Sequence, residues 1–304
     1  MAQSPPRPLS DRPGYTVGHC FVLTQLIANQ DIHALTNDES EALVHDSPPT
    51  FLRALGLTGP ALAAVFGLAG SLTANAATDV EDGFEGSMSK WRSSGNSTIR
   101  PSNKEQLRGN YSAIVELHRY QDRNSYRTEI VPRINKFAYG QTYRLKFSMY
   151  IPNDWEADRY GDTLMQIHGV KDKGDQYSGP CLVLQTKSGN WEIVSRWDSR
   201  SISTKSSSGR SQVHKSSYAR GRWTTWEFEI KWSYNSNGYI RVWKDGRQVA
   251  SRNGPNCYND RTGPYLKMGI YKPAWKQKPS QSWASDSRIQ SREYFIDEVS
   301  VHKQ

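Results

Sequence analysis

The chain has 304 residues, three cysteines and a formal net charge of +9. The number and spacing of the cysteines do not fit a zinc site. A basic balance indicates an anionic partner, and nucleic acid, anionic lipid and acidic polysaccharide all qualify on charge alone. No nucleic-acid recognition motif occurs in the sequence, so we expect no nucleic-acid partner.

Two N-terminal segments differ from the rest of the chain. Residues 1–50 lack a long apolar period and are predicted to be a disordered extension or the product of a misassigned start. Residues 51–77 carry no charge after Arg53 and end in Ala74-Asn75-Ala76, the small-x-small pattern of a signal-peptidase site. We therefore predict a signal peptide over 51–77, with an uncleaved membrane anchor as the weaker alternative. After cleavage we expect secretion and no stable membrane association.

Removal of residues 1–76 leaves 228 residues with 36 basic and 24 acidic side chains, a net charge of about +12 (36 − 24). This length suits one domain, predicted over 78–304 and expected to be monomeric. All ten tryptophans lie after residue 90, where they can fill a core or stack on sugar rings. Cys181 and Cys257 remain and can form a disulfide in an oxidising compartment.

Apolar and polar residues alternate with a period of two along most of this domain. This pattern is typical of strands with one buried face, and no helical period holds for three turns after residue 80. The sequence therefore predicts an all-β fold, an antiparallel β-sandwich of the jelly-roll type. Residues 198–212, rich in Ser and Arg, are predicted to be a mobile loop. In chain order the expected strands are 111–117, 126–133, 143–151, 163–169, 226–232, a hairpin over 239–249 turning at Asp245-Gly246, 265–271 and 293–301.

Three of these strands combine an apolar face with a polar face that carries side chains suited to binding and proton transfer. Taken singly, each polar face has an ordinary explanation, since one face of an antiparallel sheet is often solvated. Taken together, they supply cations, amide donors, an imidazole and phenols. The residues are Arg127 and Glu129 in 126–133, Gln166 and His168 in 163–169, and Tyr265, Lys267 and Tyr271 in 265–271.

These side-chain types match the needs of β-elimination at a uronic acid. Removal of the C5 proton requires donors against the neighbouring carboxylate, because negative charge develops there. Arg127 and Gln166 are the candidate donors. A base takes the proton and an acid protonates the departing glycosidic oxygen, and His168 and Tyr271 are the available pair.

The segments 127-RTE-129, 166-QIHG-169 and 265-YLKMGIYK-272 resemble motifs of the jelly-roll polysaccharide lyases. The heparin lyase I and glucuronan lyase group is the closer resemblance, supported by 243-WKDGRQV-249 and 293-EYFIDEVSV-301, and the alginate lyases are more distant. The similarity extends over about 80 to 302. Lys272-Pro273 stands where the alginate enzymes commonly have Asn-Gln, which disfavours alginate as the substrate.

The resemblance implies a secreted lyase that cleaves an acidic polysaccharide, most simply polyglucuronate, to 4,5-unsaturated products. His168 is then the base and Tyr271 the acid, or Tyr271 takes both roles with His168 assisting. Gln166 and Arg127 neutralise the substrate carboxylate. Residues expected to bind substrate are Lys267, Glu129, Tyr265 and Lys272.

Members of the heparin and glucuronan lyase group often bind a structural calcium at the sandwich edge. Glu85 and Asp297, expected in the first and last strands, are the candidate ligands here. The elimination itself requires no cofactor.

Two other functions fit parts of the sequence. A glycoside hydrolase of similar fold would use two carboxylates, and Glu227 and Glu229 share a strand face. A non-catalytic carbohydrate-binding or lectin-like module would explain the fold and the tryptophans. It would not explain His168 and Tyr271, because binding alone requires neither an acid nor a base.

Overall fold

The computed structural model describes residues 79–304 except 96–97, 121–124, 178 and 277–286. The predicted extension over 1–50 and the predicted signal peptide or anchor over 51–77 therefore lie outside the described residues. Within the described part of the chain, no helix has the length and apolar character needed to cross a membrane.

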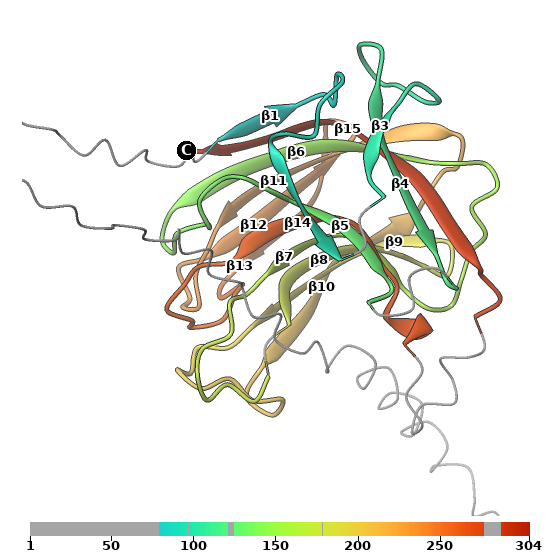
Figure 1. The fold of residues 1–304 in the computed structure, drawn as a ribbon. Coiled ribbons are helices and arrows are strands. Elements are labelled where there is room, and N and C mark those ends of the chain that lie inside the picture. Colours follow the sequence, from blue (N-terminus) through green and yellow to red (C-terminus); the bar gives the residue numbers. More distant parts are fainter. Residues whose placement is uncertain (1–78, 96–97, 121–124, 178, 277–286) are drawn as a thin grey trace, which may run out of the picture.

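Two antiparallel sheets pack face to face, which confirms the predicted β-sandwich of the jelly-roll type (Figure 1). One sheet has the order β13-β12-β11-β6-β15-β4-β3, with β1 also paired to β15. Its strands are β1 (Val80–Asp82), β3 (Arg100–Ser102), β4 (Ser112–His118), β6 (Thr142–Ile151), β11 (Arg222–Lys231), β12 (Tyr239–Lys244), β13 (Arg247–Asn253) and β15 (Ser291–Lys303).

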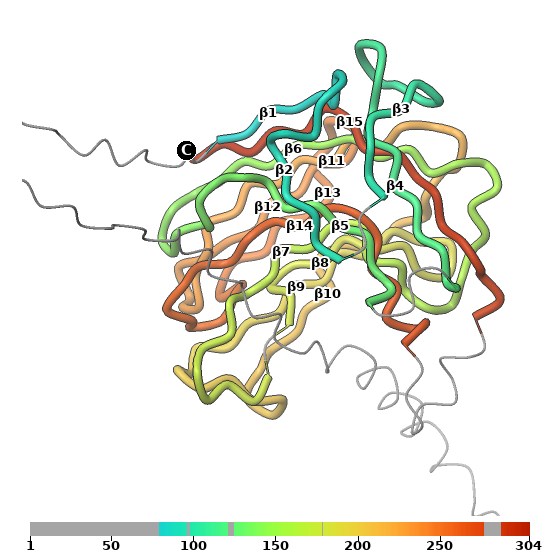
Figure 2. The backbone as a smooth tube through the Cα atoms, in the orientation of Figure 1, coloured from blue at the N-terminus to red at the C-terminus, as the bar shows by residue number. Residues whose placement is uncertain are grey.

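The second sheet contains the three strands that carry the candidate site residues. Its order is β10-β9-β8-β7-β14-β5-β2, so strands far apart in sequence run side by side (Figure 2). The only helical element among the described residues is a 3-10 helix over Pro273–Trp275. The strands of this sheet are β2 (Trp91–Gly95), β5 (Arg127–Pro132), β7 (Asp162–His168), β8 (Pro180–Lys187), β9 (Asn190–Trp197), β10 (Gly209–Ser217) and β14 (Tyr265–Tyr271).

The core lies between the sheets and consists of the apolar side chains that the alternation predicts. Phe147 of β6 and Phe228 of β11 are diagonal neighbours with stacked rings whose centroids are 5.8 Å apart, and both are buried. In the second sheet Leu266, Met268 and Ile270 are buried. Most of the described tryptophan side chains are buried in this core. Trp191, Trp226, Trp232 and Trp275 are among the largest fully buried side chains.

Local turn chemistry fixes the hairpin between β12 and β13. Asp245 and Gly246 both have positive φ, 50° and 77°, as the two central residues of a type I′ turn require. The predicted loop over 198–212 is shorter than expected, because β10 begins at Gly209. The polar composition of that strand concealed its extended conformation from the sequence analysis.

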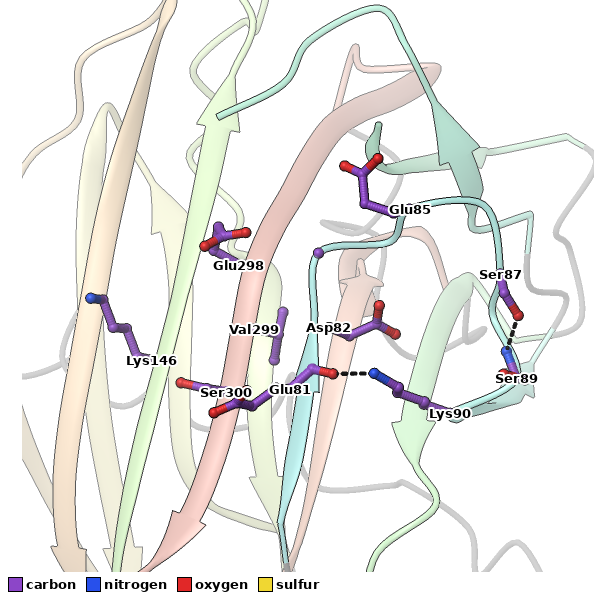
Figure 3. A pocket seen from close by; sticks show the side chains of 11 residues that line it. Glu81, Asp82, Glu85, Ser87, Ser89, Lys90, Lys146, Glu298, Val299 and Ser300 are labelled. Carbon is purple, nitrogen blue, oxygen red and sulfur yellow. Dashed lines mark hydrogen bonds between the residues drawn. The ribbon is translucent and has the colours of Figure 1, made fainter. Parts of the chain in front are cut away.

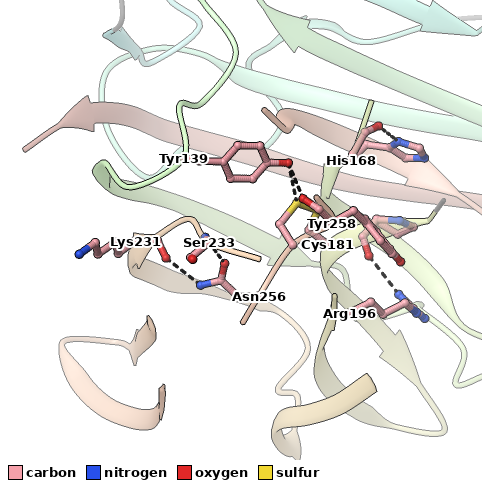
Figure 4. The surroundings of a disulfide bond; sticks show 11 residues. Tyr139, His168, Cys181, Arg196, Lys231, Ser233, Asn256 and Tyr258 are labelled. Atoms are coloured by element: carbon pink, nitrogen blue, oxygen red, sulfur yellow. Dashed lines mark hydrogen bonds between the residues drawn. A yellow bond between two sulfur atoms is a disulfide. The ribbon is translucent and has the colours of Figure 1, made fainter. Parts of the chain in front are cut away.

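Cys181 and Cys257, whose pairing the sequence left open, form a disulfide (Figure 4). Both are fully buried, and the bond joins the start of β8 to the loop that precedes β14. Next to the bond, an isolated bridge pairs Asp198 with Tyr258. The disulfide therefore anchors the chain that leads into the strand carrying Lys267 and Tyr271.

Candidate active site

Strand pairing brings the predicted polar residues onto one face of the second sheet. On one side of β14, Tyr271 lies opposite Arg127 and Gly269 lies opposite Glu129. On the other side of β14, two further polar residues of this strand pair with polar residues of β7. Because paired residues project from the same face of a sheet, all of these side chains share one surface. The β7 pairs are Lys267 with Gln166 and Tyr265 with His168.

Glu129 is the buried centre of this cluster. Its carboxylate accepts a hydrogen bond from Nε2 of Gln166 at 2.5 Å. Oε2 lies 3.6 Å from Nζ of Lys267 and 3.7 Å from Nη1 of Arg127. All four side chains are 2–4% exposed. Two cations around one carboxylate leave a net charge of +1 at the face of the sheet, which suits an incoming carboxylate.

These contacts refine the predicted role of Glu129. The sequence analysis placed it among the substrate-binding residues, whereas the structure uses both of its oxygens to hold Gln166, Lys267 and Arg127. Lys267 also donates to Oγ of Ser94 on β2, at 3.3 Å. Glu129 is therefore placed to orient these three side chains.

Tyr271 lies beneath the guanidinium of Arg127. Cζ of Arg127 is 4.4 Å from the centroid of the phenol ring, and Nζ of Lys276 is 5.5 Å from the same centroid. The tyrosine is 9% exposed. Two cationic side chains therefore lie against the phenol ring.

His168 occupies the other end of the row, beside Tyr265. The two ring centroids are 5.9 Å apart. Nδ1 of His168 lies 2.7 Å from the carbonyl oxygen of Gly169 (Figure 4). Because a carbonyl oxygen only accepts, Nδ1 donates this bond, and in the neutral ring Nε2 keeps its lone pair.

The two candidate acid–base groups therefore approach the cluster from opposite ends. Tyr271 pairs with Thr163 of β7, five residues before His168, which corresponds to roughly 16 Å along the strand. Gln166 and Lys267 lie between them. The groups suited to bind a carboxylate are thus flanked by the phenol on one side and the imidazole on the other.

Gly269 permits the close approach of β5 and β14. Its φ of 140° is a conformation that L side chains rarely adopt, and a Cβ there would collide with the carbonyl of Thr128 and lie 2.7 Å from Cα of Glu129. The pairing of β14 with β7 shifts between Met268 and Tyr271, as in a β-bulge. Sequence alternation missed this bulge, although the glycine within the strand was a signal for it.

Tyr294 supports this bulge from the opposite sheet. Its hydroxyl on β15 lies 3.1 Å from the carbonyl oxygens of both Gly269 and Leu164. Burial, followed by the charge of Glu129, raises the pKa of this phenol well above its usual value. It therefore stays protonated as a donor beneath the candidate site. Sequence analysis did not single out Tyr294, because nothing in its local pattern distinguishes it from a core tyrosine.

Lys272 requires a correction. It was predicted to bind substrate, but its ammonium is fully buried and lies 2.8 Å from Oδ2 of Asp158 and 2.7 Å from Oδ1 of Asp162. Asp162 also pairs with Arg292 of β15 at 2.9 Å. The residue that follows Tyr271 thus belongs to an internal ion-pair network and does not reach the polar face.

The candidate calcium ligands are occupied by backbone amides. Glu85 follows β1, outside the strand in which it was expected, and accepts from the N–H groups of Asn110 and Tyr111. Asp297 accepts from three further backbone N–H groups, those of Leu107, Arg108 and Glu298. Calcium takes six to eight oxygen ligands. Among the residues that the structure describes, no group of three or more His, Cys, Asp or Glu is arranged to hold a metal ion. This donor set does not fit calcium.

The first sheet carries an acidic hollow outside the candidate active site. A hollow of about 610 Å³ beside β1 and β15 is lined by Glu81, Asp82, Glu85 and Glu298, against Lys90 and Lys146 (Figure 3). An excess of carboxylates would repel an acidic polymer.

The hydrolase candidates Glu227 and Glu229 lie on β11 and are paired with Arg144 and Arg241, each at 2.6 Å. Neither carboxylate belongs to the polar face of the second sheet.

Comparison with known proteins assigns the chain to a family. Residues 84–300 match the polysaccharide lyase family. The chain belongs to this family. As a polysaccharide lyase it is an enzyme that acts on an acidic polysaccharide, and the motif resemblance described above is confirmed at the level of the family.

Solved structures add a likeness of fold. An endo-β-1,4-glucuronan lyase from the fungus Trichoderma reesei is similar with a TM-score of 0.60 and 16% identity, over 75% of this chain and 96% of that one. An alginate lyase from Aplysia kurodai matches with a TM-score of 0.46 and 12% identity, over 70% of this chain and 90% of that one. No curated protein matches the chain.

Proposed function

We propose that this polysaccharide lyase is secreted and cleaves polyglucuronate by β-elimination at the polar face of the second sheet. The observation that carries the proposal is the cluster around Glu129, where Arg127, Lys267 and Gln166 converge with one positive charge in excess. A uronate carboxylate is the ligand that this charge and these donors favour. The fold shared with a glucuronan lyase supports the choice of polymer.

In the proposed reaction, Arg127 and Gln166 hold the carboxylate while Lys267 and Tyr265 line the groove. The phenolate oxygen of Tyr271 takes the C5 proton, and the electron pair moves into a C4=C5 bond as the C4–O bond breaks. The same phenol then protonates the departing glycosidic oxygen. One residue can perform both transfers in glucuronate, because H5 and O4 lie on the same side of the sugar ring. His168, at the other end of the row, assists by holding the substrate through Nε2.

Ultraviolet absorbance tests this function. A lyase leaves a C4=C5 bond conjugated with the carboxylate, so absorbing products must accumulate from polyglucuronate and less readily from heparin or alginate. A hydrolase would form reducing ends without that absorbance, and a binding module would form neither. Either of those results would refute the proposal. N-terminal sequencing of protein recovered from the medium tests secretion, with a mature start after Ala76 as the expected result.

A further inference from the structure

The polar face does not end at Lys267 but continues across β5 to β2, the edge strand of the sheet. Ser94 lies opposite Glu129, and Arg92 lies opposite Val131. Ser94 accepts a hydrogen bond from Nζ of Lys267. Because Arg92 is two residues from Ser94, both side chains project from the same face, roughly 7 Å apart along the strand.

A small hollow of about 40 Å³ lies at this end of the face. Arg92 of β2, Lys136 of the segment after β5 and Tyr265 of β14 all contribute to its wall. Tyr265 is also the neighbour of His168 and lies near Lys267, whose Nζ is 5.8 Å from its ring centroid. Tyr265 therefore lines the hollow and also belongs to the polar face of the candidate active site.

Arg92 and Lys136 are close enough to affect each other. Partial burial and then the charge of Arg92 lower the pKa of the Lys136 ammonium. Both side chains are exposed, and neither forms an ion pair with a carboxylate in the described part of the chain. Two cations that line the same hollow repel, and an anion bound there relieves that repulsion.

We propose that Arg92 and Lys136 form a separate subsite that binds the carboxylate of a neighbouring uronate in the polymer, next to the unit held by Arg127 and Gln166. The inference rests on the proposed function, since it assumes that the polymer crosses the strands of the second sheet. The subsite confers preference for chains that are charged at successive units. It acts on binding and not on the elimination step, because it touches no reacting atom.

Steady-state kinetics on polyglucuronate test the subsite in Arg92→Gln, Lys136→Gln and the double variant. We expect KM to rise about tenfold in each single variant and further in the double variant, with kcat changed less than twofold. Lys146→Gln is the matched control, because it removes one exposed positive charge from the first sheet. Its KM should stay within twofold of the wild type. Equal KM values in the control and in the Arg92 and Lys136 variants would overturn the proposal.

A second substrate tests whether the subsite binds the carboxylate of the neighbouring uronate. Partial methyl esterification of polyglucuronate removes charges along the chain, including those that Arg127 and Gln166 hold, so it should raise KM for both proteins and raise it more for the wild type than for the double variant. An equal rise in both proteins would count against the subsite.

Calorimetric binding of polyglucuronate to Tyr271→Phe keeps this test independent of turnover. If the wild type forms no unsaturated product but binding still weakens on loss of Arg92 or Lys136, the proposed function fails and the subsite stands. If turnover is present and binding is indifferent to both residues, the subsite fails and the function stands.

Discussion

The guanidinium of Arg127 lies over the ring of Tyr271, with 4.4 Å between Cζ and the ring centroid. The two residues face each other across β5 and β14, so strand pairing fixes this relationship. It places a permanent positive charge beside the phenol that we assign as the acid–base group. It also places that charge within the cluster around Glu129, which we propose binds the substrate carboxylate.

The first prediction concerns the phenol itself. Tyr271→Phe removes the hydroxyl and keeps the ring under Arg127, so kcat should fall about 10³-fold or more while thermal stability changes little. His168→Ala should reduce activity less if Tyr271 performs both proton transfers. Initial rates of ultraviolet product formation measure both effects. A larger loss from His168→Ala would instead assign the base to the imidazole.

The second prediction concerns the centre of the cluster. Glu129→Gln preserves shape but leaves Lys267 and Arg127 without their shared counter-ion, so the side chains that bind the carboxylate lose their orientation. We expect kcat to fall about 10²-fold, as misplacement of this kind produces. KM should not rise, because the net charge facing the substrate becomes more positive. A raised KM with unchanged kcat would show that Glu129 contacts substrate directly.

The third prediction separates two lysines of the same segment. Lys272→Met leaves Asp158 and Asp162 buried without their ammonium partner, which should cost about 3–5 kcal/mol in the free energy of unfolding. Below the melting transition its kcat and KM should match the wild type. Lys267→Met should reduce activity under the same conditions. Chemical denaturation and kinetics on both variants make the comparison.

The fourth prediction is a pH dependence of stability that arises in the loop before β14. Burial, followed by the charges of Asp175 and Asp172, raises the pKa of Asp260 from 3.8 to about 7. Between these values the unfolded state has released this proton and the folded state still holds it, so stability falls as pH rises from about 4 to 7. Asp260→Asn should therefore raise the melting temperature at pH 8 and have little effect near pH 4. An effect of equal size at both pH values would contradict the assignment.

The fifth prediction concerns the disulfide. Cys181 and Cys257 are fully buried and separated by 76 residues, so replacement of both by Ser should cost ~2–5 kcal/mol of stability. Because the bond anchors the chain entering β14, activity should be lost at a lower temperature than in the wild type. Melting curves and residual activity after heating, with and without reductant, check this result.

The sequence predicted much of this architecture because period-two alternation reports directly on burial. Lys267, Gly269 and Tyr271 share a face, as do Arg127 and Glu129, and strand pairing then joins them. The alternation could not distinguish side chains that reach substrate from those that serve as internal partners. Glu129 was assigned to substrate for that reason. Lys272 has the parity of the buried face, and its assignment to substrate came from the resemblance of 265-YLKMGIYK-272 to the lyase motif.

Other features depend on contacts that no local pattern encodes. The pairing of Lys272 with Asp158 and Asp162 spans more than a hundred residues. The cation pair of Arg92 and Lys136 exists only because β2 lies beside β5. Strands such as β10 were missed because their side chains are largely polar and partly exposed on both faces.

Tyr294 connects the two layers, since its hydroxyl on one sheet contacts two carbonyl oxygens of the other sheet, on the strands of the candidate active site. The two strands that carry Gln166 and Tyr271 are thereby fastened to a common support. The backbone beneath the site then has little freedom to change conformation when a sugar chain binds. Only exposed loops and long side chains can adjust to the substrate. Selectivity among uronate polymers should consequently reflect how well the natural helical repeat of each polymer matches a rigid, preformed track.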